Sequence, residues 1–208
     1  AASPGPDTIT FDSSLNGQAI LLTNQIEIAD TNGVTIDGTA MTSGFAFSGL
    51  NVSRIFQNLT GSIATLKGFG FIGGNGTGTN GFNNGGGAIV NNGTMILSRC
   101  TFYNNNVSLT GGAIYNDSVL SLTNCTFYGN TASALGGAIA NDGTLALTHC
   151  TVSGNYGGSA GGGIYNGGVA TVANSIVSGN TSPTGADIRN FTIMNYIGTN
   201  LVAVLTGN

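Results

Sequence analysis

Charged side chains are scarce in this chain of 208 residues. Asp, Glu, Lys and Arg make up 6% of the sequence, whereas globular domains ordinarily carry roughly 25%. The 4 Lys and Arg residues and 8 Asp and Glu residues give a formal net charge of −4. Because no basic residues cluster, we expect no nucleic-acid partner.

Other features are also missing. Tryptophan is absent and histidine occurs once. No apolar run approaches the ~20 residues that a membrane-spanning helix needs, so we expect no transmembrane segment. Residues Ala1–Pro6 lack the pattern of a signal peptide, as expected of a mature N-terminus or of a cut inside a larger protein. Low charge can indicate disorder, but 40% hydrophobic residues in strict register argue against it.

One interval dominates the middle of the chain. Between residues 86 and 181, apolar, asparagine and cysteine positions recur every 25 residues without an insertion. A fixed period of this length is the signature of a solenoid. The rows are Ile89, Ile114, Ile139 and Ile164; Asn91, Asn116, Asn141 and Asn166; Asn105, Asn130, Asn155 and Asn180; and Cys100, Cys125 and Cys150, with Ser175 in the fourth place.

The third copy shows what one repeat contains. Asp142-Gly143 is a turn dipeptide, and Thr144–Thr148 alternates with a period of two residues. After His149 the alternation resumes over Cys150–Val152. No segment has the length or pattern of a helix. The sequence therefore predicts an all-β, single-stranded parallel β-helix, a solenoid of about seven to eight coils.

Stacked coils place equivalent residues directly over one another, so each row becomes a ladder. We interpret both asparagine rows as structural ladders, because a stacked Asn can bond to the Asn above and below it. Three further rows are expected to point inward: Met95, Leu120, Leu145 and Ala170; Leu97, Leu122, Leu147 and Val172; Phe102, Phe127, Val152 and Val177.

The cysteine ladder has two interpretations. Cys100, Cys125 and Cys150 are expected to point inward as free buried thiols. Stacked Cα atoms also fall within the range that a disulfide tolerates, so one pair could oxidise and leave the third thiol free.

The regular repeats are flanked by less regular segments of what we take as one domain over residues 1–208. Residues 1–85 form irregular N-terminal coils, and residues 182–208 form a C-terminal coil or cap. Val34–Gly38 and Ala64–Gly68 look like one strand position, which places Asp37 beside Lys67 as an exposed ion pair. Residues 187–189, 191–194 and 200–205 read as strands.

The N-terminal part also carries an insertion. Lys67–Asn75 matches Ser98–Asn106 with a spacing of 31, so the excess over the repeat falls in a loop over residues 75–84. That loop is either functional or a harmless insertion. No capping helix is visible at either end. The ends are covered by the irregular segments, by missing domains or by another copy of the chain.

Two short motifs carry a resemblance to a known family. Gly-Gly-Ala-Ile at residues 86–89, 111–114 and 136–139, and Phe-x-x-Asn at 102–105 and 127–130, resemble the repeats of bacterial polymorphic outer-membrane proteins. Residues 4–11 and 34–38 resemble bacterial surface or secreted proteins with right-handed parallel β-helix repeats. The resemblance covers nearly the whole chain. It implies a right-handed, pectin-lyase-like β-helix, export, and an extracellular, cell-surface or matrix role.

Catalytic candidates are few. The basic residues are Arg54, Lys67, Arg99 and Arg189, and His149 occupies an exposed bend without a carboxylate or cysteine partner. We expect no catalytic and no cofactor-binding residue. Asp117 and Asp142 would stack ~5 Å apart at a turn, either as a calcium site or as two ordinary turn residues.

Two rows on the outer surface form a candidate ligand face. Thr101, Thr126 and Thr151 stack beside Tyr103 and Tyr128. Ordered threonine ranks are what ice-binding β-helices use, and tyrosines can stack on sugars.

Three hypotheses follow from these patterns. The first is a non-enzymatic structural or adhesive β-solenoid of a bacterial surface or matrix, with cell-surface or polysaccharide partners and end-to-end self-association into filaments. The second is a carbohydrate-binding or polysaccharide-degrading β-helix. The third is an ice-binding β-helix.

Overall fold

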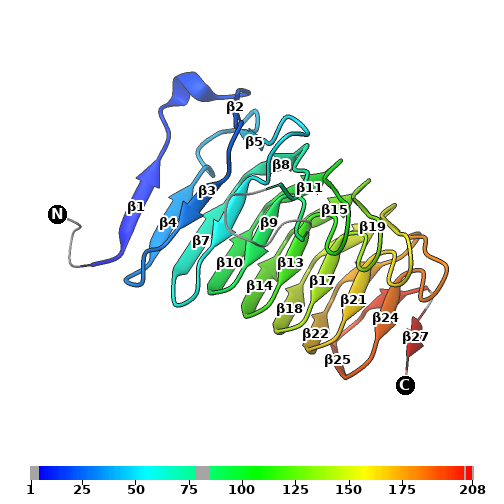
Figure 1. Cartoon of the computed structure of the whole chain (residues 1–208). Coiled ribbons are helices and arrows are strands. Elements are labelled where there is room, and N and C mark those ends of the chain that lie inside the picture. Colours follow the sequence, from blue (N-terminus) through cyan, green and yellow to red (C-terminus); the bar gives the residue numbers. More distant parts are fainter. Residues whose placement is uncertain (1–4, 78–84, 204, 208) are drawn as a thin grey trace.

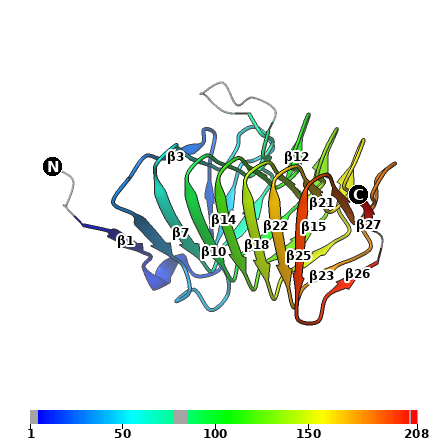
Figure 2. The same ribbon diagram turned by 90° about the horizontal axis from the view of Figure 1, so that it is seen from below.

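The computed structural model describes residues 5–77, 85–203 and 205–207. The chain winds into a stack of coils joined by parallel strands. The N-terminal coil lies at one end of the stack and the C-terminal coil at the other (Figures 1 and 2). The predicted insertion loop over residues 75–84 therefore falls mostly outside the described residues.

Three parallel sheets of eight strands run along the solenoid, so eight coils each contribute one strand to every sheet. Sheet A contains β1 (Asp7–Thr10), β4 (Val34–Asp37), β7 (Ile63–Lys67), β10 (Thr94–Ser98), β14 (Val119–Thr123), β18 (Thr144–Thr148), β22 (Val169–Ala173) and β25 (Ile193–Ile197). Sheet B contains β2 (Ala19–Leu21), β5 (Ala46–Ser48), β8 (Gly70–Ile72), β11 (Thr101–Tyr103), β15 (Thr126–Tyr128), β19 (Thr151–Ser153), β23 (Ile176–Val177) and β26 (Leu201–Val202).

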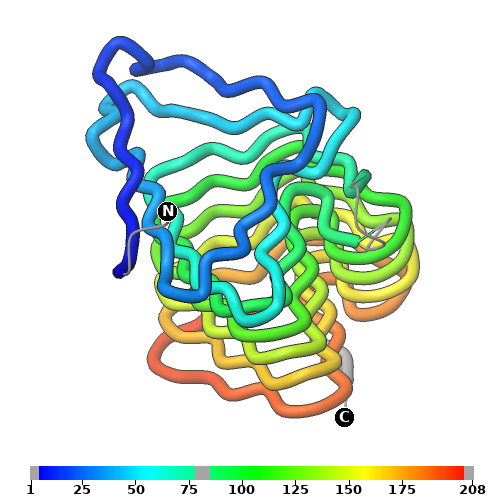
Figure 3. Tube along the Cα trace, turned by 60° about the vertical axis from the view of Figure 1, so that its left-hand side comes forward, coloured from blue at the N-terminus to red at the C-terminus, as the bar shows by residue number. Residues whose placement is uncertain are grey.

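Sheet C closes each coil. It contains β3 (Ile26–Ile28), β6 (Phe56–Asn58), β9 (Ile89–Asn91), β13 (Ile114–Asn116), β17 (Ile139–Asn141), β21 (Ile164–Asn166), β24 (Ile188–Asn190) and β27 (Leu205–Gly207). A small outer sheet adds β12 (Asn106–Val107), β16 (Thr131–Ala132) and β20 (Tyr156–Gly157), and one 3-10 turn, η1, covers Ser13–Leu15. The all-β parallel solenoid predicted from the repeat is confirmed, and Figure 3 shows its coils stacked from one end to the other.

Alternation within each strand decides which side chains fill the interior. In β14, Leu120 and Leu122 are buried, and they pair in register with Leu145 and Leu147 of β18. All three predicted inward rows are buried. In the less regular N-terminal coils, phenylalanines fill the wider space. Phe71, Phe102 and Phe127 then continue as a stack with ring centroids 4.6 and 4.7 Å apart.

Two asparagine ladders bind the coils together, as predicted. The first runs from Asn58 to Asn190, with each side-chain amide nitrogen 2.7–2.8 Å from the amide oxygen of the next member. The second runs from Asn105 through Asn130 and Asn155 to Asn180, and Asp187 accepts its last hydrogen bond at 2.9 Å. Since every rung is buried, these amides serve stacking and are closed to ligands.

In six successive coils, the bend between sheets A and B has a left-handed residue. Arg99, Asn124, His149 and Asn174 have φ between 48° and 55°, and Gly68 and Gly198 take the equivalent places with φ of 78° and 67°. The predicted exposed position of His149 is confirmed. After this bend the chain turns Cys100, Cys125 and Cys150 inward.

The flanking segments follow the sequence predictions with one correction. Asp37 pairs with Lys67 in register, and the Lys67 ammonium lies 3.7 Å from the Asp37 carboxylate. The continuous strand predicted over residues 200–205 is wrong. Two short strands, β26 and β27, replace it, because the coil must leave sheet B before it can join sheet C.

Candidate functional site

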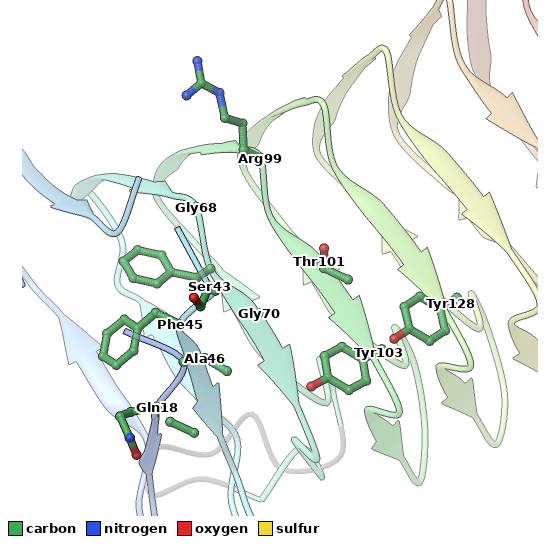
Figure 4. A pocket seen from close by; sticks show the side chains of 14 residues that line it. Gln18, Ser43, Phe45, Ala46, Gly68, Gly70, Arg99, Thr101, Tyr103 and Tyr128 are labelled. Carbon is green, nitrogen blue, oxygen red and sulfur yellow. The ribbon is translucent and has the colours of Figure 1, made fainter. Parts of the chain in front are cut away.

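The outer face of sheet B is hollowed over its first strands. The first outward position of the strands holds Ala19, Ala46 and Gly70 in the first three coils and threonine in the next three. Because three small residues precede a row of larger ones, a groove of about 570 Å³ opens there (Figure 4). The groove extends from the bend before β2 to Tyr128 of β15.

Two parallel tyrosine rings border the groove. Tyr103 and Tyr128 occupy the second outward position of β11 and β15, where they pair in register. Their ring centroids lie 5.4 Å apart with an angle of 6° between the ring planes. Both hydroxyl groups point the same way, toward the N-terminal strands (Figure 4). The pair ends at Ser153, which has no ring to continue it.

A glycine lets the first ring lie close to the sheet. A Cβ atom at Gly70 would lie 3.7 Å from Cε1 of Tyr103 and 3.3 Å from the Cβ atom of Ala46. Any larger side chain at this position would fill the space between the tyrosine and β5. The missing side chain therefore sets both the depth of the groove and the position of the ring.

Several polar side chains lie in or near the groove. Arg99 lies at the bend before β11 and extends away from the ribbon into solvent (Figure 4). Gln18 and Ser43 line the end near β2 and β5. Lys67, on the neighbouring coil, is already paired with Asp37. None of the described lining residues is acidic, so Arg99 gives the groove a positive charge.

The predicted threonine row lies directly beside the tyrosines. Thr101, Thr126 and Thr151 pair in register and are partly exposed. The row extends over three coils, because Gly70 precedes it and Ile176 follows it. The structure thus brings together all five residues of the predicted ligand face, namely Thr101, Thr126, Thr151, Tyr103 and Tyr128.

The groove meets the most regular part of the solenoid, where one family resemblance is found. Residues 99–117 and 124–142 match the Chlamydia polymorphic membrane protein repeat. Each matched segment begins at the bend before a sheet B strand and ends at the turn after a sheet C strand, so each covers the same part of its coil. The chain is a parallel β-helical repeat protein, and two of its successive coils are similar to this repeat. The matched segments make up less than half of its length.

No curated protein and no solved structure matches this chain. Within the described residues, we find no helix with the length and apolar character needed to cross a membrane.

Each matched repeat ends on one of the two stacked aspartates. The backbone nitrogen of Asp117 donates to the carbonyl of Asn91, and that of Asp142 donates to the carbonyl of Asn116. The two aspartates therefore occupy equivalent turns in successive coils. The hydroxyl of Tyr115 donates to Asp142 at 3.0 Å. Burial, together with this carboxylate, raises the pKa of Tyr115. The described residues hold no group of three or more His, Cys, Asp or Glu side chains suited to a metal. The calcium site at this pair stays a prediction.

The three cysteines of this β-helix are buried and form no disulfide with one another, as the first interpretation expects. Each thiol lies 3.4 Å from the carbonyl two residues before it. Ser175 makes the same contact with Ala173 at 2.8 Å. A hydroxyl group can therefore take the place of a thiol in this ladder and keep the hydrogen bond to the backbone.

Sequence reasoning missed the most deeply buried charge. Arg54, considered only as one of four basic residues, is completely buried before β6. Its guanidinium donates to the carbonyls of Gly76, Gly85 and Gly86 and to the side chain of Gln25. These acceptors lie 22–32 residues away along the chain, so no local pattern could have indicated them.

Proposed function

We propose that this chain is a non-enzymatic structural and adhesive β-solenoid of a bacterial cell surface or extracellular matrix. The observation that carries the proposal is the pair of matches to the polymorphic membrane protein repeat, placed on successive coils of a parallel solenoid. Ladders fill the interior of each coil, so outward side chains can serve binding without disturbing the stack. Such an architecture suits an extended surface scaffold.

The distribution of charge supports a scaffold over an enzyme. Hydrolases need two carboxylates at a defined separation around a substrate. Here Asp37 pairs with Lys67, Asp142 accepts from Tyr115, and Asp187 is buried at the end of the asparagine ladder. Arg54 is buried, and its guanidinium donates to the backbone carbonyls of three glycines.

The surface role is tested by antibody labelling of intact cells of the source organism. We expect labelling without permeabilisation, and removal of the label by brief protease treatment of intact cells. A cytoplasmic protein of the same cells, labelled in parallel, serves as the control for leakage. Label that appears only after permeabilisation would contradict the proposed location.

The adhesive and non-enzymatic parts have their own test. Purified protein coated on a surface is expected to retain cells or matrix above an albumin-coated control. The same protein, incubated with a panel of polysaccharides, is expected to release no reducing or unsaturated ends. Release of such ends in proportion to protein concentration would contradict the non-enzymatic role and identify the protein as a polysaccharide-degrading enzyme.

A further inference from the structure

We propose that the groove on sheet B binds a linear acidic polysaccharide, with one sugar ring on the Tyr103–Tyr128 pair and a carboxylate at Arg99. This assignment rests on the proposed adhesive function, for which it supplies a site and a ligand class. Few residues form this groove, and each can be compared with the residues at equivalent positions in other coils.

The shape of the groove suits an extended ligand. It crosses β2, β5, β8, β11 and β15 along the solenoid axis, a span of about 19 Å at the usual strand spacing. Its outward strand positions carry short side chains and a bare glycine, and Phe45 and Phe69 also line it. Peptide-binding sites anchor buried aromatic or aliphatic side chains in pockets. Here the small residues leave an open groove that accommodates a chain of rings.

The tyrosine pair provides the apolar contact. The two ring planes are nearly parallel, and Tyr128 is 44% exposed. The C–H face of a sugar ring is apolar while its edge carries hydroxyl groups. The exposed face of a tyrosine ring therefore contacts the apolar face of the sugar and leaves the sugar's edge to polar neighbours.

Polar groups also line the groove. Among the described contacts, no hydrogen bond to the protein is found for the hydroxyl groups of Tyr103 and Tyr128 or for the guanidinium of Arg99. Gln18 and Ser43 lie at the other end of the groove. These groups can donate to and accept from hydroxyl groups along a saccharide.

Charge selects the acidic class. Arg99 lines the groove without an acidic residue among its described neighbours there. The equivalent bend positions carry Asn124, His149 and Asn174, so the guanidinium is particular to the coil beside the hollow. An arginine presents two parallel donors to a carboxylate, which a neutral sugar does not satisfy.

The repeat supplies variants that test the site without disturbing the fold. Each substitution introduces a residue found at the same register position in another coil. Tyr103→Ser copies Ser153, Ala46→Ile copies Ile176, and Arg99→Asn copies Asn124. Tyr156→Ala is the matched control, because Tyr156 is 47% exposed and lies outside the groove.

Binding is measured by biolayer interferometry against immobilised alginate and hyaluronan as acidic probes and dextran as a neutral one. We expect the unaltered protein to bind the acidic probes in preference to dextran. Tyr103→Ser and Ala46→Ile are expected to weaken binding about tenfold or more, the scale of an aromatic anchor. Arg99→Asn is expected to weaken binding and to reduce its dependence on salt, whereas Tyr156→Ala leaves both unchanged.

The assignment is overturned if none of the probes binds, or if the groove variants bind as Tyr156→Ala does. Circular dichroism of each variant confirms that the fold is retained. Loss of surface labelling on intact cells would instead contradict the proposed function itself. A protein that labels intact cells but ignores all three polysaccharides would lose only this ligand assignment.

Discussion

At the scale of single residues, Arg54 is the side chain on which the N-terminal coils depend most. One terminal guanidinium nitrogen lies 2.8 Å from the carbonyl oxygen of Gly76 and 2.9 Å from that of Gly85. The other terminal nitrogen lies 2.7 Å from Oε1 of Gln25. Burial lowers the pKa of Arg54 to about 10, so the group stays charged at neutral pH. It therefore joins both flanks of residues 77–84 to the coil beneath.

Replacing Arg54 should make the N-terminal coils easier to unfold. We expect Arg54→Met to reduce the free energy of unfolding by about 3 kcal/mol, because several buried carbonyls lose their donor. Arg54→Lys is expected to restore only part of this loss, since an ammonium cannot reproduce the planar fork. Urea denaturation monitored by circular dichroism measures both. Arg99→Asn, at an exposed bend, is the control, and we expect it to change stability little. If both Arg54 variants changed the free energy of unfolding no more than this control does, the structural role of Arg54 would be contradicted.

At the scale of elements, the asparagine ladders hold successive coils in register. Asn116 accepts from Asn91, donates to Asn141 at 2.7 Å, and also lies 3.2 Å from the carbonyl of Thr144. We expect Asn116→Leu to cost about 2–4 kcal/mol, because buried amides on both sides lose a partner. Asn190→Leu, at the end of the same ladder, should cost less. Asn106→Ala is an exposed control, and thermal or urea unfolding that ranks the three variants in any other order would contradict the ladder's role.

The cysteine ladder makes stability depend on alkaline pH. The hydrogen bond with Cys100, together with burial, raises the pKa of the Cys125 thiol to about 12. The hydrogen bond with Cys125 and burial also raise the pKa of Cys150. The pKa of Cys100 is lowered, chiefly by its hydrogen bond with Cys125, and this offsets part of the effect. Because the unfolded chain ionises first, it binds fewer protons than the native state above pH 9, and stability falls as pH rises through that range.

A triple Cys→Ser variant tests this dependence. Ser175 already occupies the fourth place of the ladder, so serine fits the position. We expect the unfolding free energy of the unaltered protein to fall between about pH 9 and 12 more steeply than that of the variant. Other titrating groups are common to both proteins and cancel in the difference. Identical pH profiles would show that the thiols ionise equally in both states, contrary to their burial.

The strands and ladders also show how much of this structure could be predicted from the sequence. Strict spacing was enough to predict the inward rows, both ladders and the exposed bend at His149, because stacking makes each position repeat. It also brought Tyr103 and Tyr128 to one face. It did not indicate the groove, since the hollow depends on Gly70 and Ala46, which lie before the regular repeats. Nor did it indicate Arg54, whose partners depend on how distant segments pack.

At the scale of the whole molecule, the two end coils leave strand edges open within the described solenoid. β1, β2 and β3 form one end of the sheets, and β25, β26 and β27 form the other, so each has one neighbouring strand. Apolar side chains at these ends are exposed: Leu21 by 63%, Ile197 by 58% and Leu201 by 56%. Such edges can pair with a further parallel strand.

We propose that these edges pair end to end between copies, because the two ends differ and a head-to-tail contact repeats without closing. Negative-stain electron microscopy across a concentration series is expected to show fibres one solenoid wide that lengthen with concentration. A Leu21→Lys, Ile197→Lys double variant should instead give discrete particles ~40 Å long, since lysine at an edge opposes pairing. Ile176→Lys, 44% exposed on an inner coil, should still form fibres. Discrete particles of the unaltered protein at every concentration would mean that the end coils cap the solenoid and that the adhesive unit is a single chain.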